Sequence, residues 1–214
     1  MPFFEVHVAK EKFKFNCAHF IAFKGFRERL HGHNYQVGVK LSGDRGPDGY
    51  VLDFGEVKEQ VMRICKLWNE RFICPVKSDV LDIDLTSNED NITINCEDGT
   101  HFSFPRDDCL FLPIVHSSAE ELAEHFAVLL VSSVGAERLR SRGIRDIEVS
   151  VAEAPHQAAI YRCTIEHLLE IASGSAEATQ TQVERPTPKP CTHTNCCKAV
   201  ASDAQKQEQE QEQA

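Results

Sequence analysis

The sequence has no apolar run of about 18 residues, which is the length that a helix needs to cross a bilayer. Its amino-terminal segment MPFFEVHVAKEKFKF alternates apolar and polar side chains too early for a secretory signal. Basic residues are not in excess, because 23 Lys and Arg stand against 33 Asp and Glu, for a net charge of −10. We therefore expect a soluble, cytoplasmic protein that binds neither nucleic acid nor membrane.

Closely paired cysteines, which would indicate a zinc finger or a disulfide framework, are missing from the body of the chain. The nine cysteines are an odd number, and most lie inside apolar strand or helix patterns. We interpret them as buried free thiols, since free cysteine behaves as a small hydrophobe. Near the carboxyl end, Cys191, His193, Cys196 and Cys197 lack the spacing of a zinc finger, so adventitious metal binding is the most that we expect there.

The amino-acid composition of the sequence changes near residue 173. Beyond it apolar periodicity disappears, and Gln, Glu, Thr and Pro take over, as in QKQEQEQEQA. Such a composition buries too little surface to offset chain entropy. We predict one folded domain over residues 1–172 and a disordered low-complexity tail over residues 173–214.

The body shows no internal repeat, and its strands follow from period-two alternation. The predicted strands are 3–16, 35–43, 144–155 and 157–165. Alternation on both sides of Asp98-Gly99 predicts a hairpin over residues 91–104.

Two helices are predicted between these strands. Asp53 and Glu56 have the spacing of a capping box and precede an apolar stripe at helical spacing that reaches Trp68. Ser118 caps a second helix, which ends near Gly135. The order β, β, α, hairpin, α, β, β predicts an α+β body.

Three histidines lie at the ends of the first two strands. His31 and His33 are two residues apart in an extended segment, so their side chains project the same way, and Gly32 allows a tight turn between them. His19 ends the first strand, which should pair antiparallel with the strand from Tyr35. Three neutral imidazoles with an open fourth position are the ligand set of a catalytic Zn²⁺. The alternative is three unrelated histidines with separate hydrogen bonds.

Motifs spread over residues 4–165 resemble those of the 6-pyruvoyl-tetrahydropterin synthase and 6-carboxy-tetrahydropterin synthase family. They are FNCAHF, LHGHNY, GYVLDFGEVK, HSSAEELA and VSVAEAPHQAAIYR, in this order. The resemblance implies a tunnelling fold, with a four-stranded antiparallel sheet, two helices on one face and, here, an inserted hairpin. It also implies a homohexamer of two trimers with active sites at subunit interfaces, Zn²⁺ on His19, His31 and His33, and a reduced pterin triphosphate as substrate.

The resemblance gives roles to further polar residues. Glu153 matches the glutamate that anchors the pterin, and a carboxylate can accept two parallel N–H bonds from the 2-amino-pyrimidinone edge. The alternative is that Glu153 faces solvent. Ser118 matches a hydroxyl that contacts the pterin. Lys24, Arg27 and Arg29 crowd the histidine loop, where they either receive the triphosphate or form a solvated charge run.

The sequence departs from the family at the catalytic cysteine, which classical pyruvoyl synthases carry shortly before HGH. Here the nearest earlier cysteine is Cys17, before His19, and the loop offers Glu28 instead. This resembles a subgroup in which Glu replaces Cys and the enzyme cleaves 7,8-dihydroneopterin triphosphate to 6-hydroxymethyl-7,8-dihydropterin. Glu28 would then act as general base beside a Lewis-acidic Zn²⁺. By composition alone, Glu28 is a surface loop carboxylate.

A second departure follows the first helix, where the family shows an Asp-His pair and this chain has Asn69 and Glu70. Glu70 can take over the proton transfer of the family histidine, and His116 offers another imidazole. Three functions stay open. They are the hydroxymethyl-dihydropterin-forming lyase, a 6-pyruvoyl-tetrahydropterin synthase in which Glu28 and Glu70 run the triphosphate elimination, and a pterin-binding homologue without turnover.

Overall fold

A six-stranded sheet forms the centre of the computed structural model, which describes residues 4–175. Its strands are β1 (Phe4–His19), β4 (His31–Gly43), β5 (Arg71–Pro75), β9 (Cys109–Leu112), β10 (Ile144–Ala154) and β11 (Gln157–Thr164). They lie in the order β11-β10-β4-β1-β5-β9. The first four pair antiparallel, as the resemblance implied, and the short β5 and β9 extend the sheet in parallel beyond β1.

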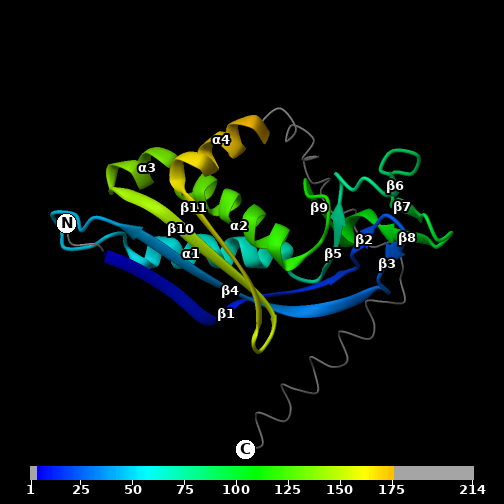
Figure 1. The fold of residues 1–214 in the computed structure, drawn as a ribbon, viewed down its shortest axis with the longest axis horizontal. Coiled ribbons are helices and arrows are strands. Elements are labelled where there is room, and N and C mark those ends of the chain that lie inside the picture. The colour runs from blue at the N-terminus through cyan, green and yellow to red at the C-terminus, as the bar shows by residue number, and fades with distance from the viewer. Residues whose placement is uncertain (1–3, 176–214) are drawn as a thin grey trace, which may run out of the picture. The chain divides into compact units, whose positions relative to one another are not determined.

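Helices cover one face of this sheet (Figure 1). Helix α1 (Phe54–Trp68) packs on β1, and α2 (Ala119–Val134) packs on β10. Their buried stripes and the inward side chains of the long strands form one hydrophobic core. The α+β arrangement predicted from the sequence is thereby confirmed.

Two further helices were not expected from the sequence. They are α3 (Ala136–Ser141) and α4 (Ile165–Ser175), and both contact α2. Helix α4 begins where a strand was predicted to end and continues past residue 172. The rest of the predicted tail, including its cysteines, lies outside the described residues. Among residues 4–175, no helix is both long enough and apolar enough to span a membrane.

The inserted hairpin is part of a small sheet at one end of the long strands (Figure 1). It consists of β6 (Leu81–Asp84), β7 (Asn91–Cys96) and β8 (His101–Pro105), followed by a 3₁₀ turn (Arg106–Asp108). Gly99 has a φ of 80°, as the tight turn between β7 and β8 requires. Ile92 and Ile94 of β7 join Phe20, at the end of β1, in a second core. This core ties the inserted sheet to the end of β1 that carries His19.

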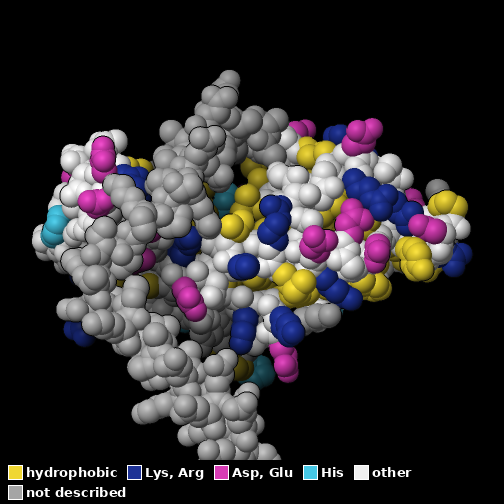
Figure 2. Space-filling view, turned by 180° about the vertical axis from the view of Figure 1, so that it is seen from behind, with side chains coloured by type: hydrophobic (Ala, Val, Ile, Leu, Met, Phe, Trp, Pro, Cys, Tyr) yellow, Lys and Arg dark blue, Asp and Glu magenta, His cyan; other side chains and the backbone are white. Residues whose placement is uncertain are grey.

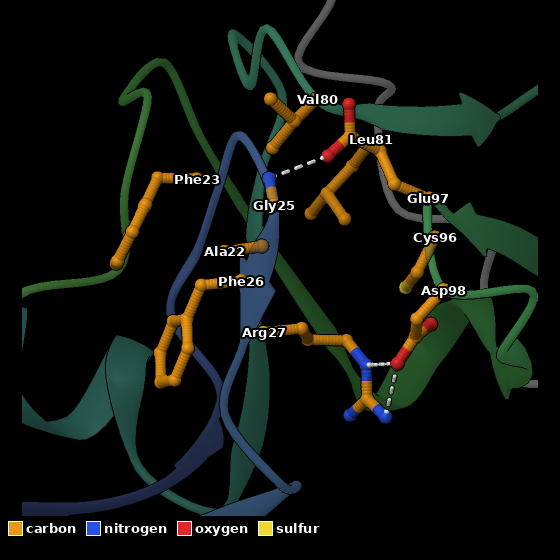
Figure 3. Close-up of a pocket in the computed structure, with 10 residues that line it drawn as sticks. All are labelled: Ala22, Phe23, Gly25, Phe26, Arg27, Val80, Leu81, Cys96, Glu97 and Asp98. Atoms are coloured by element: carbon orange, nitrogen blue, oxygen red, sulfur yellow. Dashed lines mark hydrogen bonds and ion pairs between the residues drawn. The ribbon is translucent and has the colours of Figure 1, made fainter.

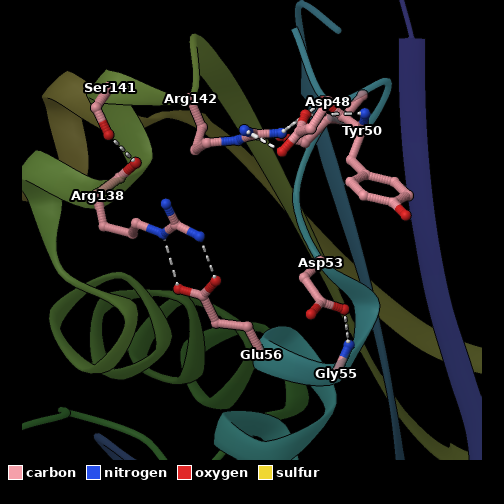
Figure 4. Close-up of polar contacts among 9 residues, drawn as sticks. Asp48, Tyr50, Asp53, Gly55, Glu56, Arg138, Ser141 and Arg142 are labelled. Carbon is pink, nitrogen blue, oxygen red and sulfur yellow. Dashed lines mark hydrogen bonds and ion pairs between the residues drawn. The ribbon is translucent and has the colours of Figure 1, made fainter. Parts of the chain in front are cut away.

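Polar contacts at the start of α1 differ from the predicted capping box (Figure 4). Oδ1 of Asp53 accepts the backbone N–H of Gly55 at 2.7 Å, so the predicted helix start is confirmed. Glu56 instead accepts two hydrogen bonds from Arg138 of α3, at 3.2 and 3.0 Å. Arg142 forms a second ion pair nearby, with Asp48 at 2.8 Å. The carboxylate of Glu56 therefore joins two helices instead of capping its own.

Candidate metal centre and active site

Strand pairing brings the three histidines together. In the β1–β4 register His19 lies opposite His31, and Cys17 lies opposite His33. The potential ligand atoms of the three rings all lie within 4.8 Å of one another. Gly32 is extended here and makes no turn, but a Cβ at this position would lie 3.0 Å from the carbonyl oxygen of Cys17. The predicted reason for this glycine was therefore wrong, and close strand contact is the actual one.

The hydrogen bonds of two rings leave their outer nitrogens available to a metal. Nδ1 of His19 lies 2.8 Å from the carbonyl oxygen of Ser117, and Nδ1 of His31 lies 2.8 Å from that of Arg29. A carbonyl only accepts, so both Nδ1 atoms donate and both Nε2 atoms carry a lone pair. Burial lowers the pKa of His19, which favours the neutral ring. This donor set fits a divalent ion such as Zn²⁺, whose histidine ligands commonly donate their second N–H to a carbonyl.

Tyr35 connects the triad to Glu153. Its hydroxyl lies 3.2 Å from Nε2 of His19 and donates to Oε1 of Glu153 at 3.3 Å. Burial, followed by the charge of Glu153, raises the pKa of Tyr35, so the hydroxyl keeps its proton. Glu153 sits where the β10–β11 register shifts, and such irregularities re-aim a side chain. The hydroxyl of Tyr35 thus contacts both His19 and Glu153, the carboxylate predicted to anchor the pterin.

Glu28 lies in the segment between β3 (Phe26–Arg27) and β4. Its Oε2 accepts the backbone N–H of Ile21 at 3.0 Å, and its own N–H donates to the Ile21 carbonyl at 2.9 Å. Its side chain is half-buried, and its charge contributes to raising the pKa of Tyr35. The carboxylate of Glu28 is therefore close enough to the hydroxyl of Tyr35 for its charge to act on it.

Cys17 is held away from any catalytic role. It is buried, and its thiol donates to the carbonyl oxygen of Trp68 at 2.9 Å. Burial raises the pKa of Cys17 to about 12, which leaves almost no thiolate at neutral pH. Cys17 therefore supplies no reactive thiol. Glu28, on the loop that leads into His31, supplies a carboxylate instead.

Glu70 lines a cavity together with one histidine of the triad, His33. Its φ of 59° is rare for a residue with a side chain, and its N–H donates to the carbonyl of Asn16 at 2.7 Å. Asn69 adds a hydrogen bond from the N–H of Asn16 to its side-chain oxygen, at 2.9 Å. Glu70 and His33 line one open cavity of about 600 Å³, together with Arg71. Strained backbone of this kind concentrates at functional sites.

The entrance to α2 contributes a residue that the sequence did not single out. Ser117 is fully buried, and its hydroxyl donates to the carbonyl of Phe20 at 2.9 Å, beside its contact with His19. Ser118 accepts the N–H of Glu121 at 3.3 Å and so caps α2. His116 lies 3.0 Å from the carboxylate of Glu121, which occupies its Nδ1.

Two residues of the site were missed for different reasons. Tyr35 follows His31 and His33 with the same spacing of two. The alternation of side chains along β4 could therefore have predicted that Tyr35 lies on the same face as the two histidines. Ser117 is 98 residues from His19 in sequence, and no local sequence pattern predicts that contact.

The fold and the site define an α+β protein of the tunnelling fold with a histidine cluster that could hold a metal ion. The sequence profile described as 6-pyruvoyl tetrahydropterin synthase matches residues 8–164. The chain belongs to this family. A Methanocaldococcus jannaschii protein, provisionally named 6-carboxy-5,6,7,8-tetrahydropterin synthase, is 32% identical over 157 residues, which are 72% of this chain and 91% of the relative.

Solved structures of Plasmodium proteins are similar as well. The 6-pyruvoyl tetrahydropterin synthase of Plasmodium falciparum is 46% identical, with a TM-score of 0.74 over 77% of this chain and 99% of that one. The synthase of Plasmodium vivax is 44% identical, with the same TM-score of 0.74 and the same coverage of 77% and 99%. Two structures of the P. vivax protein replace a catalytic glutamate, one by alanine and one by cysteine.

Proposed function

We propose that this protein is a zinc-dependent lyase that cleaves the side chain of 7,8-dihydroneopterin triphosphate to give 6-hydroxymethyl-7,8-dihydropterin. One observation carries the proposal. Glu28 lies on the loop that leads into His31, close enough to Tyr35 for its charge to raise the pKa of that hydroxyl, whereas Cys17 is buried with its thiol bonded to Trp68. The catalytic glutamate of the P. vivax relative supports a carboxylate in this role.

In the proposed reaction Glu28 takes the proton of the C2′ hydroxyl as general base. C2′ becomes a carbonyl as the C1′–C2′ bond breaks, and the electron pair moves into the C6–N5 imine of the pterin. C1′ then takes a proton. The products are 6-hydroxymethyl-7,8-dihydropterin and a triphosphorylated two-carbon aldehyde. Zn²⁺ on the three histidines would supply a Lewis acid for the side-chain hydroxyls.

Glu153 and Tyr35 position the substrate in this scheme. The carboxylate of Glu153 accepts N–H bonds from the pterin edge, and the hydroxyl of Tyr35 orients that carboxylate through the contact at 3.3 Å. Ser118 is the further proposed substrate contact, although its hydroxyl also caps α2. The pterin ring would then lie with its side chain toward Glu28.

A second candidate is 6-pyruvoyl-tetrahydropterin synthase activity, in which the triphosphate is eliminated. The observation that favours it is Glu70, which lines the same cavity as His33 and would exchange protons with a substrate bound there. The names of the Plasmodium relatives point the same way. A pterin-binding homologue without turnover is the third candidate.

Product identification separates these candidates. Purified full-length protein is incubated with 7,8-dihydroneopterin triphosphate, with and without a chelator, and the pterins are separated by chromatography. We expect 6-hydroxymethyl-7,8-dihydropterin, lost on chelation. Pyruvoyl product alone would rule out the first candidate, and no chelator-sensitive product would rule out the first two.

A variant pair tests the base. Glu28→Gln keeps the acceptor for Ile21 but cannot take a proton, so turnover should fall at least 100-fold, within the range of general-base catalysis, while zinc content stays unchanged. Glu59→Gln, at an exposed glutamate of α1, is the matched control. Wild-type turnover in Glu28→Gln would place the base elsewhere.

Assembly and location complete the proposal. We propose a homohexamer, because β11 and β9 are open sheet edges and large apolar side chains such as Phe23 and Ile160 are exposed. Figure 2 shows apolar side chains at the surface, between acidic and basic ones. The cysteines of the described residues form no disulfide, which suits a reducing cytoplasm. Light scattering of the purified protein would test the hexamer.

A further inference from the structure

The short hairpin before Glu28 is docked on the inserted sheet, far away in the sequence (Figure 3). It consists of β2 (Ala22–Phe23) and β3, joined through Gly25. The N–H of Gly25 donates to Oε2 of Glu97 at 2.9 Å. Nε of Arg27 donates to Oδ2 of Asp98 at 2.9 Å. Both carboxylates belong to the turn between β7 and β8.

These polar contacts matter for the docking, because the tip of the hairpin does not pack tightly on the inserted sheet. A cavity of about 260 Å³ lies between the hairpin and the inserted sheet. Phe23 and Phe26 stack on each other with ring centroids 4.8 Å apart, and they are 50% and 49% exposed. Ala22 anchors the base of the hairpin in the second core, but its two phenylalanines add little packing, so the contacts at the rim of the cavity help to fix its position.

One guanidinium links this rim to Glu28. Nη1 of Arg27 donates to the carbonyl oxygen of Glu28 at 2.7 Å, while Nη2 donates to the hydroxyl of Thr100 at 3.0 Å. The same group lies over the rings of Phe20 and Phe102, at 5.9 and 5.6 Å. Arg27 is thus fully engaged inside the chain, which argues against the triphosphate role considered from the sequence.

We propose that Asp98 is a positioning residue for Glu28: it fixes the guanidinium of Arg27, which holds the peptide of Glu28 on the loop that leads into His31. The inference rests on the proposed role of Glu28 as base. It gives the inserted sheet a function, because its turn supplies the carboxylate. The general reason is that small displacements of a catalytic group cost much of its rate.

Asp98→Asn tests this in the full-length protein. The amide still accepts the N–H of Thr100, which Oδ1 of Asp98 accepts at 2.9 Å, but it loses the charge that pairs with Arg27. Because Asp98 is 46% exposed, the melting temperature should not change. We expect kcat to fall roughly 10- to 100-fold, as for residues that orient a functional group, with KM and zinc content unchanged.

Matched variants separate positioning from general damage. Asp82→Asn, on β6 of the same sheet, should behave as wild type, because Asp82 contacts Asn95 and not the hairpin. Glu97→Ala removes the contact with Gly25 and should also lower kcat. This second variant keeps the inference testable if Asp98→Asn does not fold. In a Glu28→Gln background, Asp98→Asn should cause no further loss, since the group that it positions is gone.

The outcomes distinguish this inference from the proposed function. Wild-type kcat in both Asp98→Asn and Glu97→Ala would overturn the positioning role, even if Glu28→Gln is inactive. Additive losses in the double variant, or loss of zinc in Asp98→Asn, would overturn it as well. Full turnover in Glu28→Gln would instead refute the proposed function, and the inference with it.

Discussion

Replacing Tyr35 by phenylalanine tests the link between the triad and Glu153. The substitution removes one hydroxyl and leaves the ring, which is fully buried and stacks on Phe15 at a centroid distance of 4.8 Å. No cavity larger than one oxygen atom is created. Any effect therefore reports on the hydrogen bond that the hydroxyl donates to Glu153 and on its contact with His19.

Both contacts of Tyr35 are long, at 3.2 Å to His19 and 3.3 Å to Glu153. A hydrogen bond to a charged group contributes about 1.5–3 kcal/mol, and these distances place the value at the lower end. With a metal on His19, only the bond to Glu153 remains. We expect the free energy of unfolding to fall by about 1.5 kcal/mol and KM to rise about tenfold, because a freer carboxylate binds the pterin less well.

Urea unfolding and steady-state kinetics measure the two quantities for Tyr35→Phe. The control is Tyr50→Phe, at a tyrosine that is 60% exposed. If Tyr35→Phe matches wild type in both stability and KM, the hydroxyl does not hold Glu153, and the proposed pterin anchor is wrong. A lower kcat with unchanged KM would contradict the same reasoning.

Three further predictions concern the metal and the thiols. His33→Ala should lose bound zinc, measured by atomic absorption, because two imidazoles remain of a three-ligand set; stoichiometric zinc would refute the site. Cys17→Ser should keep turnover, since a hydroxyl can also donate to the Trp68 carbonyl. An inactive variant would mean that the thiol of Cys17 takes part in catalysis. Burial raises the pKa of Cys17, Cys65, Cys74 and Cys109 from 9.0 to about 12, so the unfolded chain loses these protons first. Stability should be complete below pH 9 and fall as the pH rises above 9, because the unfolded thiols ionise while the buried ones keep their protons, and a flat alkaline unfolding profile would contradict this.

Local patterns were sufficient for the long elements and for the histidine pair. Period two is a property of neighbouring residues, so it located the long strands and placed His31 and His33 on one face. The short strands β5 and β9 were not predicted, because an apolar run of four or five residues does not by itself distinguish a strand from a buried helical segment. Helix α4 escaped because its residues were read as a strand end and the start of a tail.

The sequence alone indicated the family, through motifs that resemble those of its members, and with the family the tunnelling fold. The short spacing of His31 and His33, with His19 at the end of the preceding strand, was enough to predict the candidate metal ligands, because such spacing depends only on neighbouring residues. Only the tertiary structure decided which groups surround the triad. Ser117 reaches His19 across 98 residues, Tyr35 reaches Glu153 across 118, and Arg27 reaches Asp98 across 71. Such contacts depend on how the strands and the inserted sheet pack against each other, and packing between distant segments leaves no periodic trace in the chain.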